Sequence, residues 1–510
     1  MLDETTGELM LGTRLLAAIV VFSVAAPSTQ RAQVAPPVVP TSVAQRDVGL
    51  PSNDDLVARM IQEGTQRSHV EADLSYLLDV IGPRLSGSPE MRRANDWTQQ
   101  KFRDYGADRS ELEAWTFGVG WTRGPMTLRM LAPQRRELLG VSWAWSPGTT
   151  GALAGDVVYI DARTKHDFDR RFAGKLKGAW VMIGPAALIP NPDGSPMTSA
   201  DSARLDAARR AQLPQNDEER AFMPGRAQLL VREGAAGLIH DGAKEFGLFT
   251  MAGSPAAVSP FPQIVISNET YSQFQRLALR GERVRLEADI KNSFTPADIQ
   301  QYNTVADIRG TEKPDEVVIL GAHLDSWDIA TGGTDNGAGA IAVLEAARIL
   351  KAAGVRPKRT IRFVLFGGEE EGLFGSQAYT EDHRAELNKI QALLVIDNGT
   401  GQVTGMTLQG REELRDMWKS MLSPLTPLGQ LLVKSGNKTG TDHLAFLPYG
   451  VPGFNYDQAT RGYNHTHHSQ VDDFNHTVPA DVAQIATIMA VNAWQFADMK
   501  EFLVRGPKSR

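Results

Sequence analysis

The stretch EVVILGAHLDSWDIATGGTDNGAGAIAVLEAARILKAAG (residues 316–354) decides the fold class that the sequence predicts. It begins with a short apolar run typical of a buried strand and ends with a longer run typical of a helix. The polar loop between them contains His323, Asp325 and Asp335. These three residues are either an ordinary turn with a helix cap or one half of a metal site.

The same alternation of strand and helix continues to the end of the chain. Further strands are predicted in RTIRFVLFGG (359–368) and IQALLVIDN (390–398), with a helix between them in LFGSQAYTEDH (373–383). The last predicted helix is DVAQIATIMAVNAWQFADM (481–499). Apolar strands that alternate with helices indicate an α/β fold, here a mixed, mostly parallel sheet flanked by helices.

The chain is 510 residues long, which is more than one ordinary core accommodates. Residues 54–125 begin with helical periodicity, and we assign them to the same domain as residues 293–505. Residues 126–292 instead contain short β-like runs separated by turns, which predicts a β-rich insert. Within it, the polar and broken segment 185–220 is expected to be an exposed excursion.

The amino-terminal stretch TRLLAAIVVFSVAAPST (13–29) has a basic residue, a short apolar run and then small residues. That pattern is typical of a secretory signal and is too short for a membrane-spanning helix. We therefore predict a signal peptide over residues 1–32, counted from Met1 or Met10, and a linker over 33–53. The mature protein is expected to be secreted or periplasmic, with no membrane span.

Composition narrows the classes of function. The formal net charge of −7 argues against a nucleic-acid partner, which would favour a basic surface. The chain has no cysteine, so disulfides, cysteine–metal sites and a cysteine nucleophile are excluded.

Three of the predicted strands end in acidic residues or a histidine, and parallel strands place their carboxyl ends at one edge of a sheet. The residues at these ends are His323, Asp325, Glu369, Glu370 and Asp397. The late segment NHTHHSQVDDF (464–474) adds two adjacent histidines, His467 and His468. Each element alone has an ordinary explanation, such as a cap, a solvated charge run or a surface loop. Together they favour a site of imidazoles and carboxylates, a set that suits zinc or a harder ion such as manganese or cobalt.

These residues and the strings around them resemble the co-catalytic zinc exopeptidases, a family of aminopeptidases and glutamate carboxypeptidases, and most closely its carboxypeptidase Q type. The similar strings, in chain order, are IGPRLSGSPEMRRAND, GAHLDSWD, DNGAG, RPKRTIRFVLFGGEEEG, VIDNG, GTDHLAFLPYGVPG and HHSQVDD. The insert resembles the protease-associated domain found in such enzymes, through AGKLKGAWVMIG and GRAQLLVREGAAGLIH.

The resemblance implies two Zn²⁺ ions per chain, with Co²⁺ or Mn²⁺ as substitutes. By this resemblance Asp335 bridges the two ions, His323 and Asp397 hold one of them, and Glu370 and His468 hold the other.

The resemblance also implies two catalytic carboxylates that do not bind metal. Glu369 would be the general base, and Asp325 would orient the ring of His323 through a hydrogen bond.

The roles of several neighbouring residues stay open. His467 is either a substrate-side group or structural, and Asp442 and His443 are candidates for the pocket wall. Asp472 occupies the last place of the family's His-Ser/Thr-x-x-Asp pattern, whereas Asp473 stands where the family usually has threonine or serine.

The implied function is zinc-dependent hydrolysis of dipeptides or short peptides by a dipeptidase or carboxypeptidase, acting as a homodimer. An aminopeptidase of the same family is the main alternative. A glutaminyl cyclase and a non-catalytic binding ectodomain are the others. The metal ligands do not determine the polarity, which depends on the group that holds the free end of the substrate.

Overall fold

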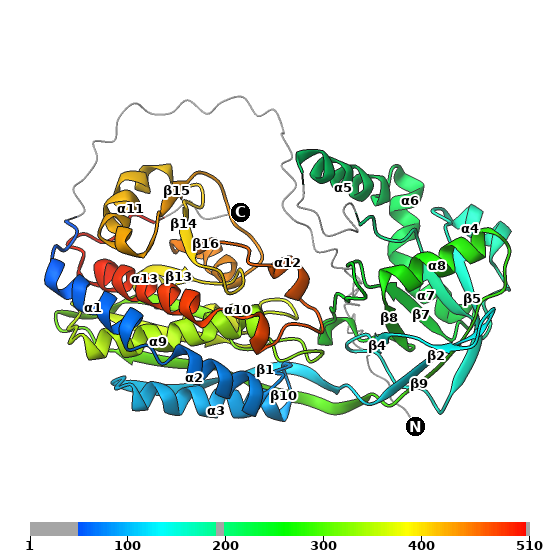
Figure 1. The fold of residues 1–510 in the computed structure, drawn as a ribbon, viewed down its shortest axis with the longest axis horizontal. Coiled ribbons are helices and arrows are strands. Elements are labelled where there is room, and N and C mark those ends of the chain that lie inside the picture. Colours follow the sequence, from blue (N-terminus) through cyan, green and yellow to red (C-terminus); the bar gives the residue numbers. More distant parts are fainter. Residues whose placement is uncertain (1–48, 190–197, 506–510) are drawn as a thin grey trace, which may run out of the picture.

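The computed structural model describes residues 49–189 and 198–505. The predicted signal peptide and residues 33–48 of the predicted linker lie outside this part of the chain. Two eight-stranded sheets form two lobes that lie side by side (Figure 1). The mixed α/β fold expected from the sequence is confirmed.

The first sheet is mixed, with parallel strands at its centre and an antiparallel pair on each side of that centre. Its strands, in spatial order, are β1 (Arg109–Thr122), β10 (Ser293–Ile308), β12 (Arg359–Phe366), β11 (Lys313–His323), β13 (Ile390–Val395), β16 (Gly453–Gln458), β14 (Val403–Thr407) and β15 (Leu432–Lys434). The four central strands, β12, β11, β13 and β16, run parallel to one another. The strands predicted from residues 316–323, 359–368 and 390–398 are therefore confirmed as neighbours in one sheet.

Both faces of this sheet are buried, which explains the unbroken apolar run that opens β11. Val318 and Leu320 point into the core beneath α9 and α13, whereas Val317 and Ile319 point into the core on the opposite face. Successive side chains of a strand alternate between faces, so only a strand covered on both sides needs apolar residues at every position.

Helices cover the two faces of the first sheet (Figure 1). They are α1 (Asp54–Gln66), α2 (Val70–Ser75), α3 (Pro89–Asp104), α9 (Ala338–Ala352), α10 (Phe374–Asp382), α11 (Arg415–Leu422), α12 (Tyr463–Thr466) and α13 (Pro479–Asp498). The helical periodicity at the start of residues 54–125 corresponds to α1, α2 and α3, and the last predicted helix is confirmed as α13.

The second sheet has its own core and its own covering helices. Its strands, in spatial order, are β3 (Arg136–Glu137), β2 (Met126–Ala132), β9 (Arg285–Ile290), β5 (Leu153–Ile160), β6 (Trp180–Ile183), β7 (Gly237–Asp241), β8 (Gln263–Ile266) and β4 (Gly140–Ser142). Its helices are α4 (Lys165–Arg171), α5 (Ser199–Gln212), α6 (Asp217–Phe222), α7 (Arg226–Arg232) and α8 (Asn268–Leu279).

The chain passes between the two lobes along one pair of strands. β1 and β10 are antiparallel neighbours over most of their length, and Thr122 pairs with Ser293 at the end of this ladder. All strands of the second sheet lie between these two residues in the sequence.

The polar segment 185–220 is more regular than its sequence suggests. Residues 198–222 form α5 and α6, and Thr198 and Asp201 form a capping box at the start of α5. Most α5 side chains are exposed, so the segment lacks the strong apolar face by which helices are recognised in a sequence. Across residues 49–189 and 198–505, no helix combines the length and the apolar character required to cross a membrane.

Candidate metal centre

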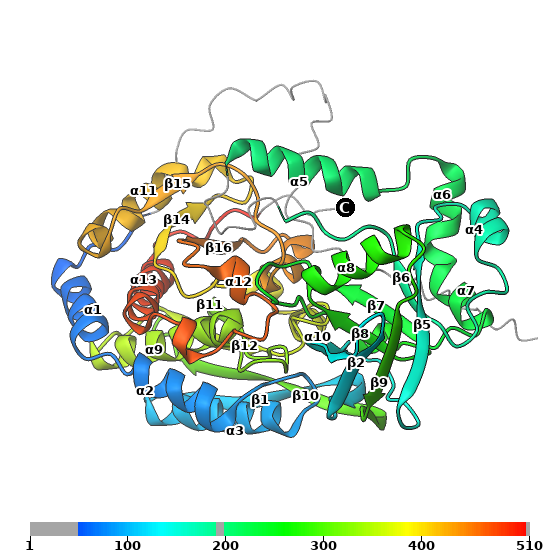
Figure 2. The same cartoon turned by 45° about the vertical axis from the view of Figure 1, so that its right-hand side comes forward.

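The carboxyl ends of the central parallel strands meet at one edge of the first sheet. β11 ends at His323, the turn after β12 contains Glu369 and Glu370, and Asp397 follows β13. Parallel strands present these ends on the same side, so residues far apart in the sequence meet there. The segment after α12 adds His467 and His468, and α12 lies at the boundary between the two lobes in both views (Figures 1 and 2).

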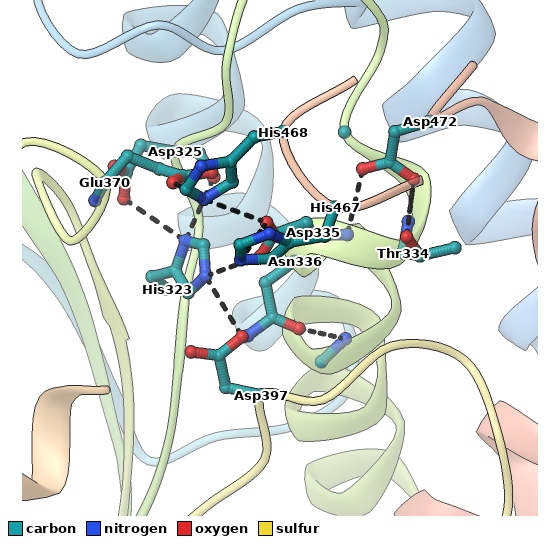
Figure 3. A network of polar contacts seen from close by, with 12 residues as sticks. His323, Asp325, Thr334, Asp335, Asn336, Glu370, Asp397, His467, His468 and Asp472 are labelled. Carbon is teal, nitrogen blue, oxygen red and sulfur yellow. Dashed lines mark hydrogen bonds and ion pairs between the residues drawn. The ribbon is translucent and has the colours of Figure 1, made fainter. Parts of the chain in front are cut away.

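Asp335 lies at the centre of this cluster, in the turn that enters α9, and its two carboxylate oxygens face different groups (Figure 3). Asp335 Oδ1 lies 3.4 Å from His323 Nε2, which itself lies 3.3 Å from Asp397 Oδ1. Asp335 Oδ2 lies 3.5 Å from His468 Nε2, which lies 2.9 Å from Glu370 Oε2. One carboxylate is therefore shared by two clusters, each of which contains one histidine and one further acid.

The cluster has the polar atoms and the charge to hold metal ions. Asp335 Oδ2 and Glu370 Oε1 are buried and have no hydrogen-bond partner in the described part of the chain. Buried oxygens of this kind cost free energy unless a hydrogen bond or a cation satisfies them. A small hollow of about 10 Å³, lined by Asp335, Glu370 and His468 among others, lies beside these atoms. Two histidines and three carboxylates without a thiolate suit zinc.

Burial and neighbouring charges shift the pKa of the carboxyl groups in the cluster. Burial raises the pKa of Glu370 well above its usual range, and the charge of Asp335 adds to the effect. Burial opposes ionisation of Asp335 too, but the bond from His323 and the charges of the neighbouring histidines hold the pKa of Asp335 below its usual range. Bound cations would favour the ionised form of both carboxylates.

Glu369 differs from Glu370, although the two residues are adjacent. Glu369 is half-buried, and its carboxylate makes no hydrogen bond or ion pair with any residue that the structure describes. Burial raises the pKa of Glu369 well above its usual range. A carboxylate beside the cluster but outside its ion pairs is free to exchange a proton with a water or a substrate.

Asp325 lies behind His323 and contacts its ring through both the main chain and the carboxylate. His323 Nδ1 donates to the main-chain oxygen of Asp325 at 3.1 Å, whereas Asp325 Oδ1 lies 3.6 Å from this nitrogen. Asp325 Oδ2 instead accepts a hydrogen bond from the main-chain N–H of Glu370 at 3.2 Å. Asp325 thereby connects the turn after β12 to the end of β11.

Asp472 holds the turn that presents Asp335. Its Oδ1 accepts from the main-chain N–H and the hydroxyl of Thr334, at 2.6 and 2.7 Å, and its Oδ2 accepts from the N–H of Asp335 at 3.0 Å (Figure 3). Burial raises the pKa of Asp472 to about 7.

The three residues whose roles the sequence left open differ in how far they are buried. His467 Nε2 lies 3.8 Å from Asp335 Oδ2, and its ring stacks on that of His468 with 3.7 Å between centroids, so His467 is a further candidate ligand. Asp442 is fully buried, which raises its pKa to about 7. His443 is also buried, and its Nε2 lies 3.2 Å from the main-chain oxygen of Lys438.

Arg84 is a site residue whose role the sequence did not reveal. Its buried guanidinium donates to the main-chain oxygens of Leu324, Thr331 and Gly332, at 2.6, 2.6 and 2.9 Å. Gly332 has a positive φ of 63°, and a Cβ there would lie 2.2 Å from that of Ser326. Burial lowers the pKa of Arg84 to about 10, against the opposing charges of the acidic cluster. Its motif, IGPRLSG, was visible in the sequence but reads locally as a turn-rich loop.

The second lobe also contacts the site. In the loop after β7, Met251 N donates to the main-chain oxygen of His468 at 2.9 Å, and His468 Nδ1 donates to the oxygen of Met251 at 3.1 Å. Gln470 adds two bonds to this loop: it accepts from the N–H of Phe249 and donates to the oxygen of Gly247, both at 2.9 Å. Main-chain partners leave no signal in a sequence, so these contacts could not be predicted.

Comparison with known proteins gives matches over most of the chain. Residues 303–493 match the model of peptidase family M28. Carboxypeptidase Q of Mus musculus is 30% identical over 436 residues, which cover 85% of this chain and 86% of that protein. The human carboxypeptidase Q is 29% identical over the same shares of both chains.

Solved structures agree with these matches. A peptidase M28 precursor from Shewanella amazonensis has a TM-score of 0.72 at 26% identity, covering 89% of this chain and 99% of that one. A zinc aminopeptidase from Bacillus subtilis has a TM-score of 0.59 at 20% identity, covering 85% and 98%. At that identity the second likeness concerns the fold alone.

Proposed function

Because the chain belongs to peptidase family M28 and is a metallo-exopeptidase, we propose that it hydrolyses dipeptides or short peptides with two zinc ions held around Asp335. The single observation behind this proposal is the division of the Asp335 carboxylate between two clusters. A carboxylate whose oxygens serve different ligand groups suits a pair of ions better than one ion.

In this proposal, His323 and Asp397 hold one ion, Glu370 and His468 hold the other, and Asp335 contacts both. When bound, two such ions supply Lewis-acid chemistry, polarising the scissile carbonyl and lowering the pKa of a water molecule.

The residues of the chain then move the protons. Glu369 accepts a proton from the attacking water as the water oxygen bonds to the carbonyl carbon of the peptide. When the carbon–nitrogen bond breaks, Glu369 passes this proton to the leaving amine. Its carboxylate has no ion pair among residues 49–189 and 198–505, which supports this role, because a group engaged by a metal or a cation could not accept the proton.

We assign the polarity of a dipeptidase or carboxypeptidase of the carboxypeptidase Q type. We also propose that residues 126–292 are an inserted domain of the protease-associated type that forms one wall of the cleft. The contacts of its loop with His468 and Gln470 support this role.

Export after removal of residues 1–32 and assembly as a homodimer belong to the same proposal. The mass of the secreted chain tests the removal, and light scattering tests the dimer.

The first experiment counts metal and measures hydrolysis. We expect two zinc ions per chain by elemental analysis, and hydrolysis of an unblocked dipeptide. Glu369→Gln should lower kcat by about 10²–10⁴-fold and keep both ions. Glu381→Gln makes the same chemical change on the exposed surface of α10 and should leave activity unchanged. A zinc-reconstituted chain that binds no metal and cleaves no dipeptide would exclude the proposed function.

A further inference from the structure

Lys244 of the second lobe reaches into the first lobe beside the metal centre. It follows β7, in the loop that contacts His468, and its Nζ donates to the main-chain oxygen of Asn464 in α12. Only 9% of Lys244 is exposed. Asn464 lies three and four residues before the two adjacent histidines of the cluster.

This lysine is a buried cation without an ion-pair partner among the residues that the structure describes. A lysine ammonium has three N–H donors, of which Asn464 uses one. Another partly buried lysine near the cleft differs, because Lys438 Nζ has Asp457 Oδ1 at 3.4 Å. A buried ammonium with no carboxylate at ion-pair distance costs free energy, so Lys244 is suited to bind an anion from outside.

The charges that act on Lys244 include those of residues in the site. Burial lowers the pKa of Lys244 to about 8, and the charges of Glu245, Asp335 and Asp472 act against this decrease. In turn, the charge of Lys244 acts on both His467 and His468. Lys244 is therefore within electrostatic range of the cluster around Asp335, although it belongs to the other lobe.

The backbone around Lys244 is held against the same segment. Glu245 Oε1 lies 2.8 Å from His465 Nε2, and Gln470 bonds the loop at Gly247 and Phe249. These contacts position the ammonium before a ligand arrives, which reduces the entropy lost on binding.

We propose that Lys244 binds the free carboxylate at the carboxyl end of the peptide substrate. The proposal rests on the proposed function and specifies its polarity. A peptide without acidic side chains has one free carboxylate, at its carboxyl end, and an ammonium here repels the free amine of the other end. Short peptides thus bind with the carboxyl end beneath the second lobe and the scissile bond at the zinc ions, which makes the enzyme a carboxypeptidase or dipeptidase.

The test compares one dipeptide as the free acid and as the carboxyl-terminal amide, in the zinc-loaded full-length chain. The wild type should prefer the acid. Lys244→Met should lower kcat/KM for the acid by at least about 10-fold, chiefly through KM, because charged hydrogen bonds of this kind contribute about 1.5–3 kcal/mol. For the amide, kcat/KM of Lys244→Met should stay within about twofold of the wild-type value. Lys244→Arg should retain most of the preference for the acid.

A matched control is Lys438→Met, which removes a lysine that already has a carboxylate partner. It should leave the ratio between acid and amide unchanged. If Lys244→Met lowers kcat/KM equally for both substrates, Lys244 only holds the loop against Asn464 and the proposal is wrong. A wild type that cleaves the amide better than the acid also overturns it, and does so without any variant. A wild type that cleaves neither substrate contradicts the proposed function instead.

Discussion

Met251 and His468 exchange two hydrogen bonds across the boundary between the lobes, and one of them fixes the imidazole ring. His468 Nδ1 donates to the oxygen of Met251, which leaves Nε2 directed towards Asp335 and Glu370. A carbonyl behind a histidine sets its tautomer and orients it towards a metal. In the proposed metal centre, the second lobe therefore orients a ligand that belongs to the first lobe.

This arrangement predicts that loosening the loop weakens zinc binding. Gln470→Ala removes the two side-chain bonds that hold the loop at Gly247 and Phe249. We expect the apparent zinc affinity to fall by about 10-fold, as for other supporting partners of metal ligands. A competition titration with a chromophoric chelator measures this change. Gln62→Ala, in an exposed glutamine pair on α1, is the control and should bind zinc like the wild type.

Chelation should destabilise the folded protein reversibly. Ligands that bind only the native state add about 2.7 kcal/mol at a free concentration 100 times Kd, so zinc should raise Tm in differential scanning calorimetry. Asp335→Asn removes the shared charge and should abolish most of this increase. Glu369→Gln should show the full increase, and its failure to do so would place Glu369 among the ligands.

Arg84 should be needed for stability. Arg84→Met leaves the main-chain oxygens of Leu324 and Thr331 without their donor, and Gly332 with Gly337 N alone. It also removes the buried cation beside the acidic cluster. We expect the free energy of unfolding in urea to fall by about 3 kcal/mol. Arg93→Met, on the exposed face of α3, should change it by less than about 0.5 kcal/mol. Equal effects of the two substitutions would contradict the role of Arg84.

A pH-dependent contribution to the free energy of unfolding should come from His383, which lies outside the metal centre. Its Nε2 lies 2.9 Å from Glu113 Oε2, and this bond raises the pKa of His383 above its usual 6.5. The charge of Arg362 lowers this pKa, and the charge of Glu386 raises it. The stabilisation is complete below pH 6.5 and is lost as the pH rises through the raised pKa. His383→Gln should therefore destabilise by up to about 1 kcal/mol at pH 5.5 and less at pH 8.5, in urea titrations. A larger loss at pH 8.5 would contradict this assignment.

Local patterns were sufficient to predict the central strands and the residues at their ends. Val317–Leu320 is apolar at every position because both faces of β11 are buried, and this signal is contained within one segment. The sheet then brings His323, Glu370 and Asp397 together because parallel strands end at one edge.

The remaining features depend on contacts between distant segments. His468 and Met251 lie 217 residues apart, and the contact uses a main-chain oxygen that any residue could supply. Lys244 is recognised only by its burial and by the lack of an ion-pair partner among the described residues. Neither feature can be read from a sequence. The strands β1 and β10 were not predicted either, because the alternation in RSELEAWTFGVGWT is interrupted by polar and glycine residues and by two irregularities in the pairing.

The pairing of Thr122 with Ser293 has a consequence for how such enzymes diversify. The entire second lobe occupies the position of a hairpin turn between β1 and β10, whose ends already lie within one strand spacing of each other. Genetic exchange at this point can replace the lobe while the order of the first sheet stays unchanged. Each replacement would bring a different residue to the position of Lys244, so substrate preference can evolve separately from the hydrolytic chemistry.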